Sequence, residues 1–425
     1  MEKYCEIRRT YNKLGELPAI VPCMLYEPLH PGDRSRIGVV LMHSDDDYIE
    51  FLPAIELAKR GYRVAAAHVS KSSNPLDRKM QEVGMVADFL RSCPGVDKVL
   101  LLGHSGGATL MSAYQSAAEN GNAVFQNPER IIALDDIGAL TPADGVMLLD
   151  SNFGNGVMSL VSLDPAIVDE ETGMKRDPSL NLFNPANGYH EEGCSYSGEF
   201  ISRFLRAQAE RMNRLIDYCQ ERVEIINHNA GQFMDDEPLV IPGGTQFAPN
   251  NKLFPQMTGF FSRTKEEWNL LHQDGSVTRE IVPCRRIFRP GADSAGEYGF
   301  GALTTTVKTF LKSSAVRVNP DLYAYDASEL HGIEWGSSYC VTVGNVEGIS
   351  APMLMMGMTG SYEYIAAEHI YRHAGRTSDK TLAFVEGAGH NFTPATEAER
   401  YPGEFGDTAK VCFDYVSQWI ASRFL

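Results

Sequence analysis

The stretch Val99-Leu100-Leu101-Leu102-Gly103-His104-Ser105-Gly106-Gly107 decides the fold of this 425-residue chain. Its apolar run predicts a strand buried on both faces, and the next residues predict a helix. A G-x-S-x-G turn between a strand and a helix lifts its serine above the sheet edge, where the helix N-terminus offers free N–H groups to a developing oxyanion. We therefore expect Ser105 to be a nucleophile, the alternative being a tight turn in a fold that has lost catalysis.

Outward from this stretch, strand-like and helix-like segments alternate. Two short extended segments, at about 4–12 and 19–27, come first. Apolar strands are expected at 37–42, 64–69, 99–102, 146–149, 353–356 and 382–385, and helices at 48–60, 364–375 and 407–424 as well as through Met80–Leu90 and Leu110–Tyr114. Such alternation predicts an α/β fold with a mostly parallel sheet covered by helices on both faces.

The alternation stops after about residue 155 and resumes near residue 350. Between these points the chain is rich in Asn, Pro and Gly, with one long helix at about 197–224 and a hairpin around Gly275. We interpret 1–155 and 345–425 as one core domain, and 156–344 as an inserted lid or cap domain.

Composition excludes several classes of protein. Lys and Arg total 38 against 55 Asp and Glu, a net charge of −17 that argues against nucleic acid or an anionic membrane as partner. The eight cysteines are scattered without a CxxC pair, and no secretory signal or membrane span is apparent. We expect a soluble, reduced, cytoplasmic protein. Nucleotide-binding fingerprints are also lacking, so no cofactor is expected.

Two histidines one helical turn apart, His369 and His373, have a spacing that can bind zinc. A third ligand is not evident, so we expect an exposed face of an ordinary helix and no metal.

The chain resembles the α/β-hydrolase family at three places: the Ser105 turn, the strand end Val39–Ser44, and the loop Gly387-Ala388-Gly389-His390-Asn391-Phe392. The resemblance covers about 1–155 and 345–425. It implies an eight-stranded, mostly parallel sheet and a triad in the chain order serine, acid, histidine. His390, after the last expected strand, would then be the general base for Ser105.

The acid of this triad is open between two positions. Glu363 follows the penultimate strand and is our preferred choice, since its loop and that of His390 open at the same sheet edge. Asp150, at the end of strand 146–149, is the alternative, and Glu368 is a third.

The oxyanion donors are expected to be the backbone N–H groups of Gly106 and of Ser44 (or Asp45). The run Asp45-Asp46-Asp47 is expected to cap the following helix, or else to recognise a cationic or hydroxylated substrate group. Candidate substrate contacts are His43, Asp45, His104 and Phe153.

The expected activity is that of a cofactor-free serine hydrolase, an esterase acting on a bulky, aromatic or apolar small-molecule ester. The expected insertion and the strand end before it supply aromatic residues suited to such a substrate, most of them as the core of the lid itself: Phe153, Phe183, Tyr189, Tyr196, Phe200, Phe204, Phe260, Phe261, Tyr298, Phe300 and Trp335. An acyltransferase, a C–C bond hydrolase and a non-catalytic binding protein are alternatives, and a homo-oligomer stays open.

Overall fold

A computed structural model describes residues 4–17, 19–246 and 251–425. Its centre is a ten-stranded sheet in the order β1-β2-β4-β3-β5-β6-β13-β14-β8-β9. The strands are β1 (Ile7–Leu14), β2 (Val21–Pro28), β3 (Ile37–Met42), β4 (Arg63–Ala67), β5 (Lys98–Ser105), β6 (Gly145–Ser151), β8 (Arg263–Leu271), β9 (Val277–Pro283), β13 (Met353–Met358) and β14 (Lys380–Val385). All neighbouring pairs from β4 to β8 are parallel, and the pairs at the two ends are antiparallel. The predicted α/β class is confirmed.

Helices cover both faces of this sheet because its strands are apolar on both sides. Every residue of β3, β6 and β13 is buried. Alternate residues point to opposite faces, so Val40 and Met42 join one core cluster and Val39 and Leu41 the other. The first cluster includes residues of α2 (Leu76–Ser92), α3 (Gly107–Asn120) and α10 (Ala366–His373), and the second includes those of α1 (Leu52–Lys59) and α11 (Thr408–Phe424).

The hairpin around Gly275 is confirmed, but it does not lie in a separate lid. Strands β8 and β9 form it, and β8 pairs in parallel with β14, so the hairpin extends the central sheet from eight strands to ten. Residues 263–283 therefore belong to the sheet, and the predicted boundary at 156–344 was wrong for this part. The hairpin lies inside the interruption of the sequence pattern, and nothing in the sequence indicated that β8 would pair with β14.

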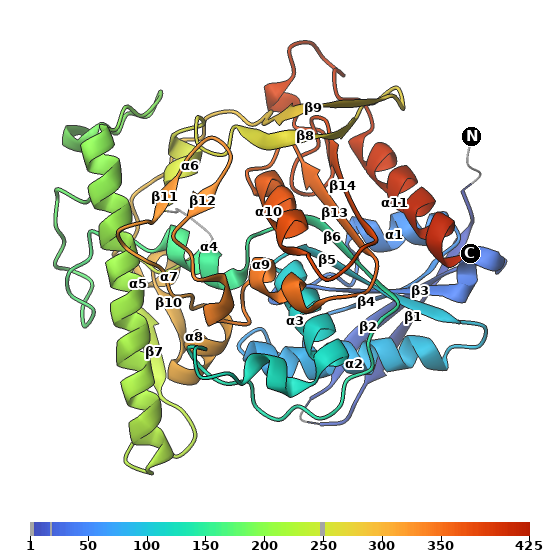
Figure 1. Cartoon of the computed structure of the whole chain (residues 1–425), viewed down its shortest axis with the longest axis horizontal. Coiled ribbons are helices and arrows are strands. Elements are labelled where there is room, and N and C mark those ends of the chain that lie inside the picture. The colour runs from blue at the N-terminus through green and yellow to red at the C-terminus, as the bar shows by residue number, and fades with distance from the viewer. Residues whose placement is uncertain (1–3, 18, 247–250) are drawn as a thin grey trace.

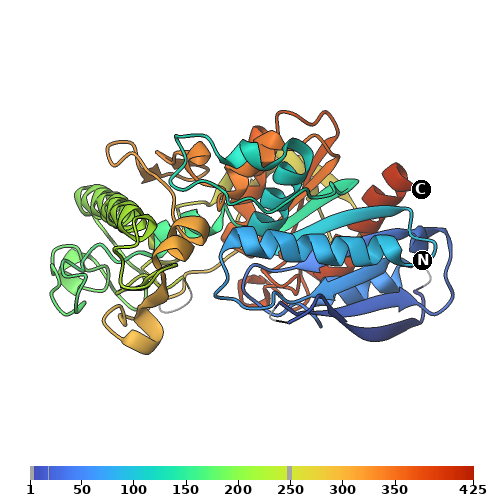
Figure 2. The same ribbon diagram turned by 90° about the horizontal axis from the view of Figure 1, so that it is seen from below.

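The rest of the interruption lies beside the sheet, as Figures 1 and 2 show. Its main element is α5 (Gly198–Asn227), which confirms the long helix and begins where Ser197 Oγ accepts a hydrogen bond from the Phe200 N–H at 3.1 Å. Further elements of this region are α4 (Asn155–Ser162), β7 (Pro238–Ile241), α6 (Leu253–Gln256), α7 (Tyr298–Gly301), β10 (Leu303–Thr306), α8 (Val307–Ser313), β11 (Ala324–Tyr325), β12 (Leu330–His331) and α9 (Thr342–Asn345). None of the described helices is long and apolar enough to cross a membrane.

Candidate active site

Ser105 lies on a strained turn between β5 and α3. Its φ is +53°, in the left-handed region that non-glycine residues rarely adopt. The flanking glycines have no room for a side chain: a Cβ at Gly103 would lie 2.6 Å from Ala108 Cα, and one at Gly107 would lie 2.5 Å from the Met42 carbonyl oxygen. The strand, sharp turn and helix that the sequence predicted are therefore present.

His390 follows β14 and is held by Asp150. Its Nδ1 lies 2.6 Å from Asp150 Oδ2, and Asp150 Oδ1 accepts the Met358 N–H at 2.9 Å. Asp150 is fully buried, whereas the His390 side chain is 36% exposed. The imidazole therefore contacts a buried carboxylate on one side and is open to solvent on the other. The chain order is serine, aspartate, histidine.

The preference for Glu363 as the partner of His390 was wrong in geometry. Glu363 Oε2 lies 3.9 Å from His390 Nδ1, and the Ser105 hydroxyl donates to this same oxygen at 3.4 Å. Asp150 is closer because it is an extra residue in β6: Leu149 pairs with His104 and Ser151 with Ser105. Its φ of +43° turns its side chain toward the histidine loop. No sequence signal marks this bulge.

Glu368, the third choice, lies outside the site. Its carboxylate accepts hydrogen bonds from the Lys265 and Glu266 N–H groups and from Trp268 Nε1. It therefore fixes the start of β8 against α10.

The two carboxylates next to His390 dominate its electrostatics. Desolvation lowers the pKa of His390, but Glu363 and Asp150 outweigh this effect and raise it to about 9. Burial raises the pKa of the Glu363 carboxyl, although the charges of His390 and Lys252 oppose the shift. The site thus holds a charged imidazole between two carboxyl groups at neutral pH.

His104 positions the His390 loop. Its side chain is buried, its Nε2 lies 2.7 Å from the His390 carbonyl oxygen, and its Nδ1 lies 2.7 Å from the Tyr48 hydroxyl. Burial holds the pKa of His104 well below its usual value, so the neutral ring donates from Nε2 and accepts at Nδ1. Both ring nitrogens are occupied by protein groups, and the predicted contact of His104 with substrate stays a prediction. Tyr48 carries no motif that would have revealed its part.

The end of β3 lies directly against Gly106. A Cβ on Gly106 would lie 2.8 Å from Ser44 Oγ, 2.9 Å from Asn155 Oδ1 and 3.1 Å from His43 Nε2. His43 Nδ1 accepts the N–H groups of Asp45 and Asp46 at 3.0 and 2.8 Å, so Nε2 carries the ring proton. Burial lowers the pKa of His43, which makes it a neutral donor beside Gly106.

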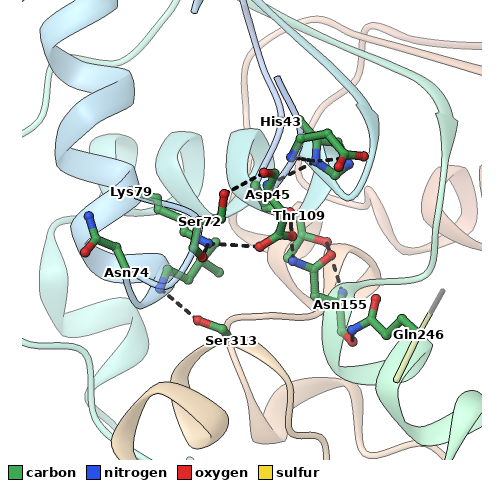
Figure 3. A network of polar contacts seen from close by, with 12 residues as sticks. His43, Asp45, Ser72, Asn74, Lys79, Thr109, Asn155, Gln246 and Ser313 are labelled. Atoms are coloured by element: carbon green, nitrogen blue, oxygen red, sulfur yellow. Dashed lines mark hydrogen bonds and ion pairs between the residues drawn. The ribbon is translucent and has the colours of Figure 1, made fainter. Parts of the chain in front are cut away.

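A polar network holds this strand end in place (Figure 3). Asn155 Nδ2 donates to Ser44 Oγ at 3.1 Å, and the Asn155 N–H donates to Thr109 Oγ1 at 3.2 Å. Asn155 is the first residue of α4 and the last residue of the expected core segment 1–155, and the sequence gave no reason to single it out.

Asp45 belongs to the same network, and its predicted contact with substrate stays a prediction. It accepts from Ser44 Oγ at 2.5 Å and pairs with the buried Lys79 Nζ at 3.0 Å. The expected helix cap was also wrong: α1 begins at Leu52, four residues later than predicted, and Phe51 at its N-cap makes no side-chain hydrogen bond.

A cavity of about 660 Å³ opens beside His390. One wall comes from the loops after β13 and β14, and the other from residues 255–256 and 286–292 of the interruption. None of the aromatic residues expected to line a pocket lines this cavity, whose aromatic lining residue is Tyr362. Phe153 instead packs on Phe261 and lines a much smaller apolar cavity with Glu363.

Two groups of three potential metal ligands occur among the described residues. The first, His104, Asp150 and His390, is held in the hydrogen bonds given above. The second, Asp326, Glu329 and His331, lies in and beside the β11–β12 hairpin, where Lys265 and Arg372 neutralise Glu329. The predicted exposed face of α10 was wrong for His369, which is buried, and His373 Nδ1 pairs with the His369 carbonyl oxygen at 2.8 Å.

The strand order, the Ser105 turn and the histidine loop together define an α/β-hydrolase fold. No family model and no curated protein matches the chain. Solved structures similar to it include the α/β hydrolase GrgF from Penicillium sp. sh18, at 11% identity and a TM-score of 0.44, covering 97% of this chain and 98% of that one. Est1E from Butyrivibrio proteoclasticus is 10% identical with a TM-score of 0.40 and the same coverage. A thermostable carboxyl esterase from Bacillus coagulans is 11% identical with a TM-score of 0.41, covering 99% of both chains.

Proposed function

We propose that the protein is a serine hydrolase that cleaves a carboxylic ester of a small molecule through an acyl-enzyme on Ser105. The observation that carries the proposal is the Asp150–His390 pair, joined at 2.6 Å, at the sheet edge where the strained turn presents Ser105. Asp150 would hold the imidazole with its Nε2 available as a base and would stabilise the charged ring that forms.

The reaction begins with a neutral His390. A rotation about χ1 of Ser105 turns its hydroxyl from Glu363 to His390 Nε2, which takes the proton as Oγ attacks the ester carbonyl. The Gly106 and Ser44 N–H groups stabilise the oxyanion, with His43 Nε2–H as a third donor at the same place. His390 then protonates the departing alcohol, and a water molecule activated by His390 releases the acid and restores Ser105.

The substrate is proposed to bind in the 660 Å³ cavity, which is large enough for a drug-sized molecule. One of its walls is formed by the interruption, which supports the role of a lid for this part of the chain. Among the described residues, Tyr362 is the one Phe, Tyr or Trp residue that lines this cavity. The lining therefore does not select for an aromatic substrate.

A panel of esters of increasing acyl and alcohol size tests the proposal with wild type and Ser105→Ala. We expect wild type to hydrolyse at least one ester, and Ser105→Ala to lose turnover by about 10⁴–10⁶-fold at an unchanged melting temperature. Equal turnover in both proteins would end the serine-hydrolase assignment.

One observation favours a second candidate, hydrolysis of a C–C bond beside a ketone. Glu363 Oε2 lies 3.4 Å from Ser105 Oγ, and burial raises the pKa of its carboxyl, so the minor protonated form of Glu363 holds a proton next to the scissile bond. After Ser105 attacks one carbonyl of a β-diketone, the C–C bond breaks and the departing enolate carbon takes that proton. Loss of β-diketone cleavage in Glu363→Gln, with ester hydrolysis retained, would support this candidate.

A further inference from the structure

Three arginines follow β9 on one short segment, and they differ in their partners. Arg285 pairs with Glu386 at 2.8 Å, and Arg289 pairs with Glu397. Arg286, between them, has no carboxylate partner in the part of the chain that the structure describes. Its Nη2 donates to the Phe260 carbonyl oxygen, and its Nε and Nη1 are shielded from solvent, with the Cys284 thiol beside the guanidinium.

An unpartnered guanidinium in such a place is costly. Burying a polar group without a hydrogen-bond partner destabilises a protein, and the cost is larger when the group is charged. The chain is strongly acidic, with 55 Asp and Glu against 38 Lys and Arg, so carboxylates outnumber the cations that they could pair with. The guanidinium also lies over the Phe254 ring, with its carbon 6.0 Å from the ring centroid, which restricts the directions from which a partner can approach.

Arg286 lines the same 660 Å³ cavity as His390. The charged residues of this lining are Arg286, Arg289, Glu397 and His390. Because Arg289 and Glu397 neutralise each other, Arg286 is the fixed positive charge that a ligand in the cavity meets without a protein counter-charge.

We propose that Arg286 binds a carboxylate carried by the substrate, so that the preferred substrates are esters with a free carboxylate elsewhere in the molecule, such as half-esters of dicarboxylic acids. A guanidinium offers parallel N–H donors that match the two oxygens of a carboxylate. Nε and Nη1 are shielded from solvent, so we assign the contact to the part of the guanidinium that faces the cavity, where no carboxylate of the described residues pairs with it. This inference rests on the proposed ester hydrolysis and adds the class of its substrate.

The test compares half-esters with neutral esters of the same shape. Monoethyl succinate, glutarate and adipate are paired with the corresponding ethyl ester amides, in which a neutral carboxamide replaces the carboxylate. For the best chain length, wild type should favour the half-ester by about 10–100-fold in kcat/KM, as a charge-assisted hydrogen bond provides. Arg286→Gln should reduce this ratio to about 1, and Arg286→Lys should retain part of it.

Arg285→Gln is the matched control, because Arg285 is the neighbouring arginine, has its own carboxylate partner and does not line the cavity. It should keep the wild-type ratio. The inference is overturned if wild type shows no preference at any chain length, if Arg286→Gln keeps the preference, or if Arg286→Gln lowers both esters of a pair equally. A stronger preference for a phosphate-bearing ester than for the half-esters would overturn the assignment to a carboxylate.

A binding measurement separates this inference from the proposed reaction. Ser105→Ala is titrated calorimetrically with succinate, glutarate and adipate, and the double variant Ser105→Ala/Arg286→Gln is titrated in parallel. We expect binding in the first protein and at least about tenfold weaker binding in the second. Ser105-dependent hydrolysis of neutral esters alone would leave the reaction standing and refute the carboxylate site. Dicarboxylate binding without hydrolysis of any ester would support the carboxylate site and refute the proposed reaction.

Discussion

At the scale of single residues, the site is built on two strained positions that face each other across β5 and β6. Ser105 and Asp150 both have positive φ, at +53° and +43°. Such conformations cost about 1–3 kcal/mol each and persist where the surrounding structure imposes them. Here the strain has a use, because it turns both side chains out of the sheet, Asp150 toward His390 and Ser105 toward Glu363 beside it.

The assignment of the acid predicts unequal effects of two amide substitutions. Asp150→Asn removes the carboxylate that orients His390, so turnover should fall by about 10²–10⁴-fold with little change in substrate binding. Compared above pH 9, where His390 is neutral in both proteins, Glu363→Gln should change ester turnover by less than about tenfold, since Glu363 lies 3.9 Å from Nδ1 and does not orient the ring. Steady-state kinetics of both variants test this assignment. A larger loss of turnover in Glu363→Gln than in Asp150→Asn would mean that Glu363 is the acid of the triad.

Glu363 should instead control the pH dependence. His390 must be neutral to accept the Ser105 proton, and its pKa of about 9 means that it is mostly protonated at pH 7. The kcat/KM of wild type should therefore rise about tenfold per pH unit up to an inflection near pH 9. Glu363→Gln removes a charge that raises this pKa, so its inflection should move to lower pH.

The same profile recorded for Lys98→Gln, an exposed position at the far end of β5, provides a control that should match wild type. An inflection that Glu363→Gln leaves unmoved would contradict the electrostatic role of Glu363.

At this scale the sequence singled out Ser105 and His390, which the structure places at one sheet edge, but it preferred Glu363 to Asp150, the carboxylate that contacts His390. Ser105 could be found because its turn requires glycines at fixed spacing, and His390 because it follows the last strand. The choice between Asp150 and Glu363 depended on a one-residue bulge, which has no signature in the sequence. The same holds for His104, whose place beside the nucleophile suggested substrate contact although both its nitrogens are satisfied internally.

At the scale of elements, the approach of α3 to the end of β3 sets the geometry of the proposed oxyanion site. Gly107 is the first residue of α3, and a Cβ there would lie 2.5 Å from the Met42 carbonyl oxygen. Gly107→Ala should therefore displace β3, lower the free energy of unfolding by about 1–3 kcal/mol and reduce turnover. Urea denaturation and ester kinetics measure both effects.

Gly198→Ala is the matched control for this substitution. Gly198 is likewise the first residue of a helix, α5, but a Cβ there meets no atom within 4 Å. Alanine should be neutral or stabilise by up to about 1 kcal/mol. Equal effects of the two substitutions would mean that the close packing of α3 on β3 has no energetic consequence.

The central elements were predictable because buried parallel strands are continuous apolar runs. The runs at 37–42, 99–102, 146–149, 353–356 and 382–385 all lie in strands of the sheet. The β8–β9 hairpin was recognised as a hairpin, but its partner is set by tertiary contact with β14 and not by local sequence. Helix α1 starts late because residues 43–51 form the loop that carries His43 and Asp45.

At the scale of the whole molecule, the interruption shares one hydrophobic core with the sheet. Phe200, Phe204 and Ile216 of α5 fall in the same cluster of buried residues as Leu110 of α3 and Met355 of β13. Figure 2 shows α5 on one side of the molecule, and contacts through α4 and α8 connect it to the remainder.

A shared core predicts a single unfolding transition. Phe204 is fully buried, so Phe204→Ala should lower the free energy of unfolding by about 3–5 kcal/mol. Calorimetry should show this loss as a shift of the one transition that also reports the sheet. Two separate transitions, of which Phe204→Ala shifts only one, would show that the interruption folds independently.

The most direct measurement of the central claim is the mass of the protein after reaction with a fluorophosphonate, followed by peptide mapping. An activated Ser105 should take up one phosphonyl group, located on the peptide that contains Gly103–Gly107. Ser105→Ala should take up none, and Asp150→Asn should react far more slowly than wild type. Labelling at another residue, or no labelling of a protein that still hydrolyses esters, would contradict an acyl-enzyme on Ser105.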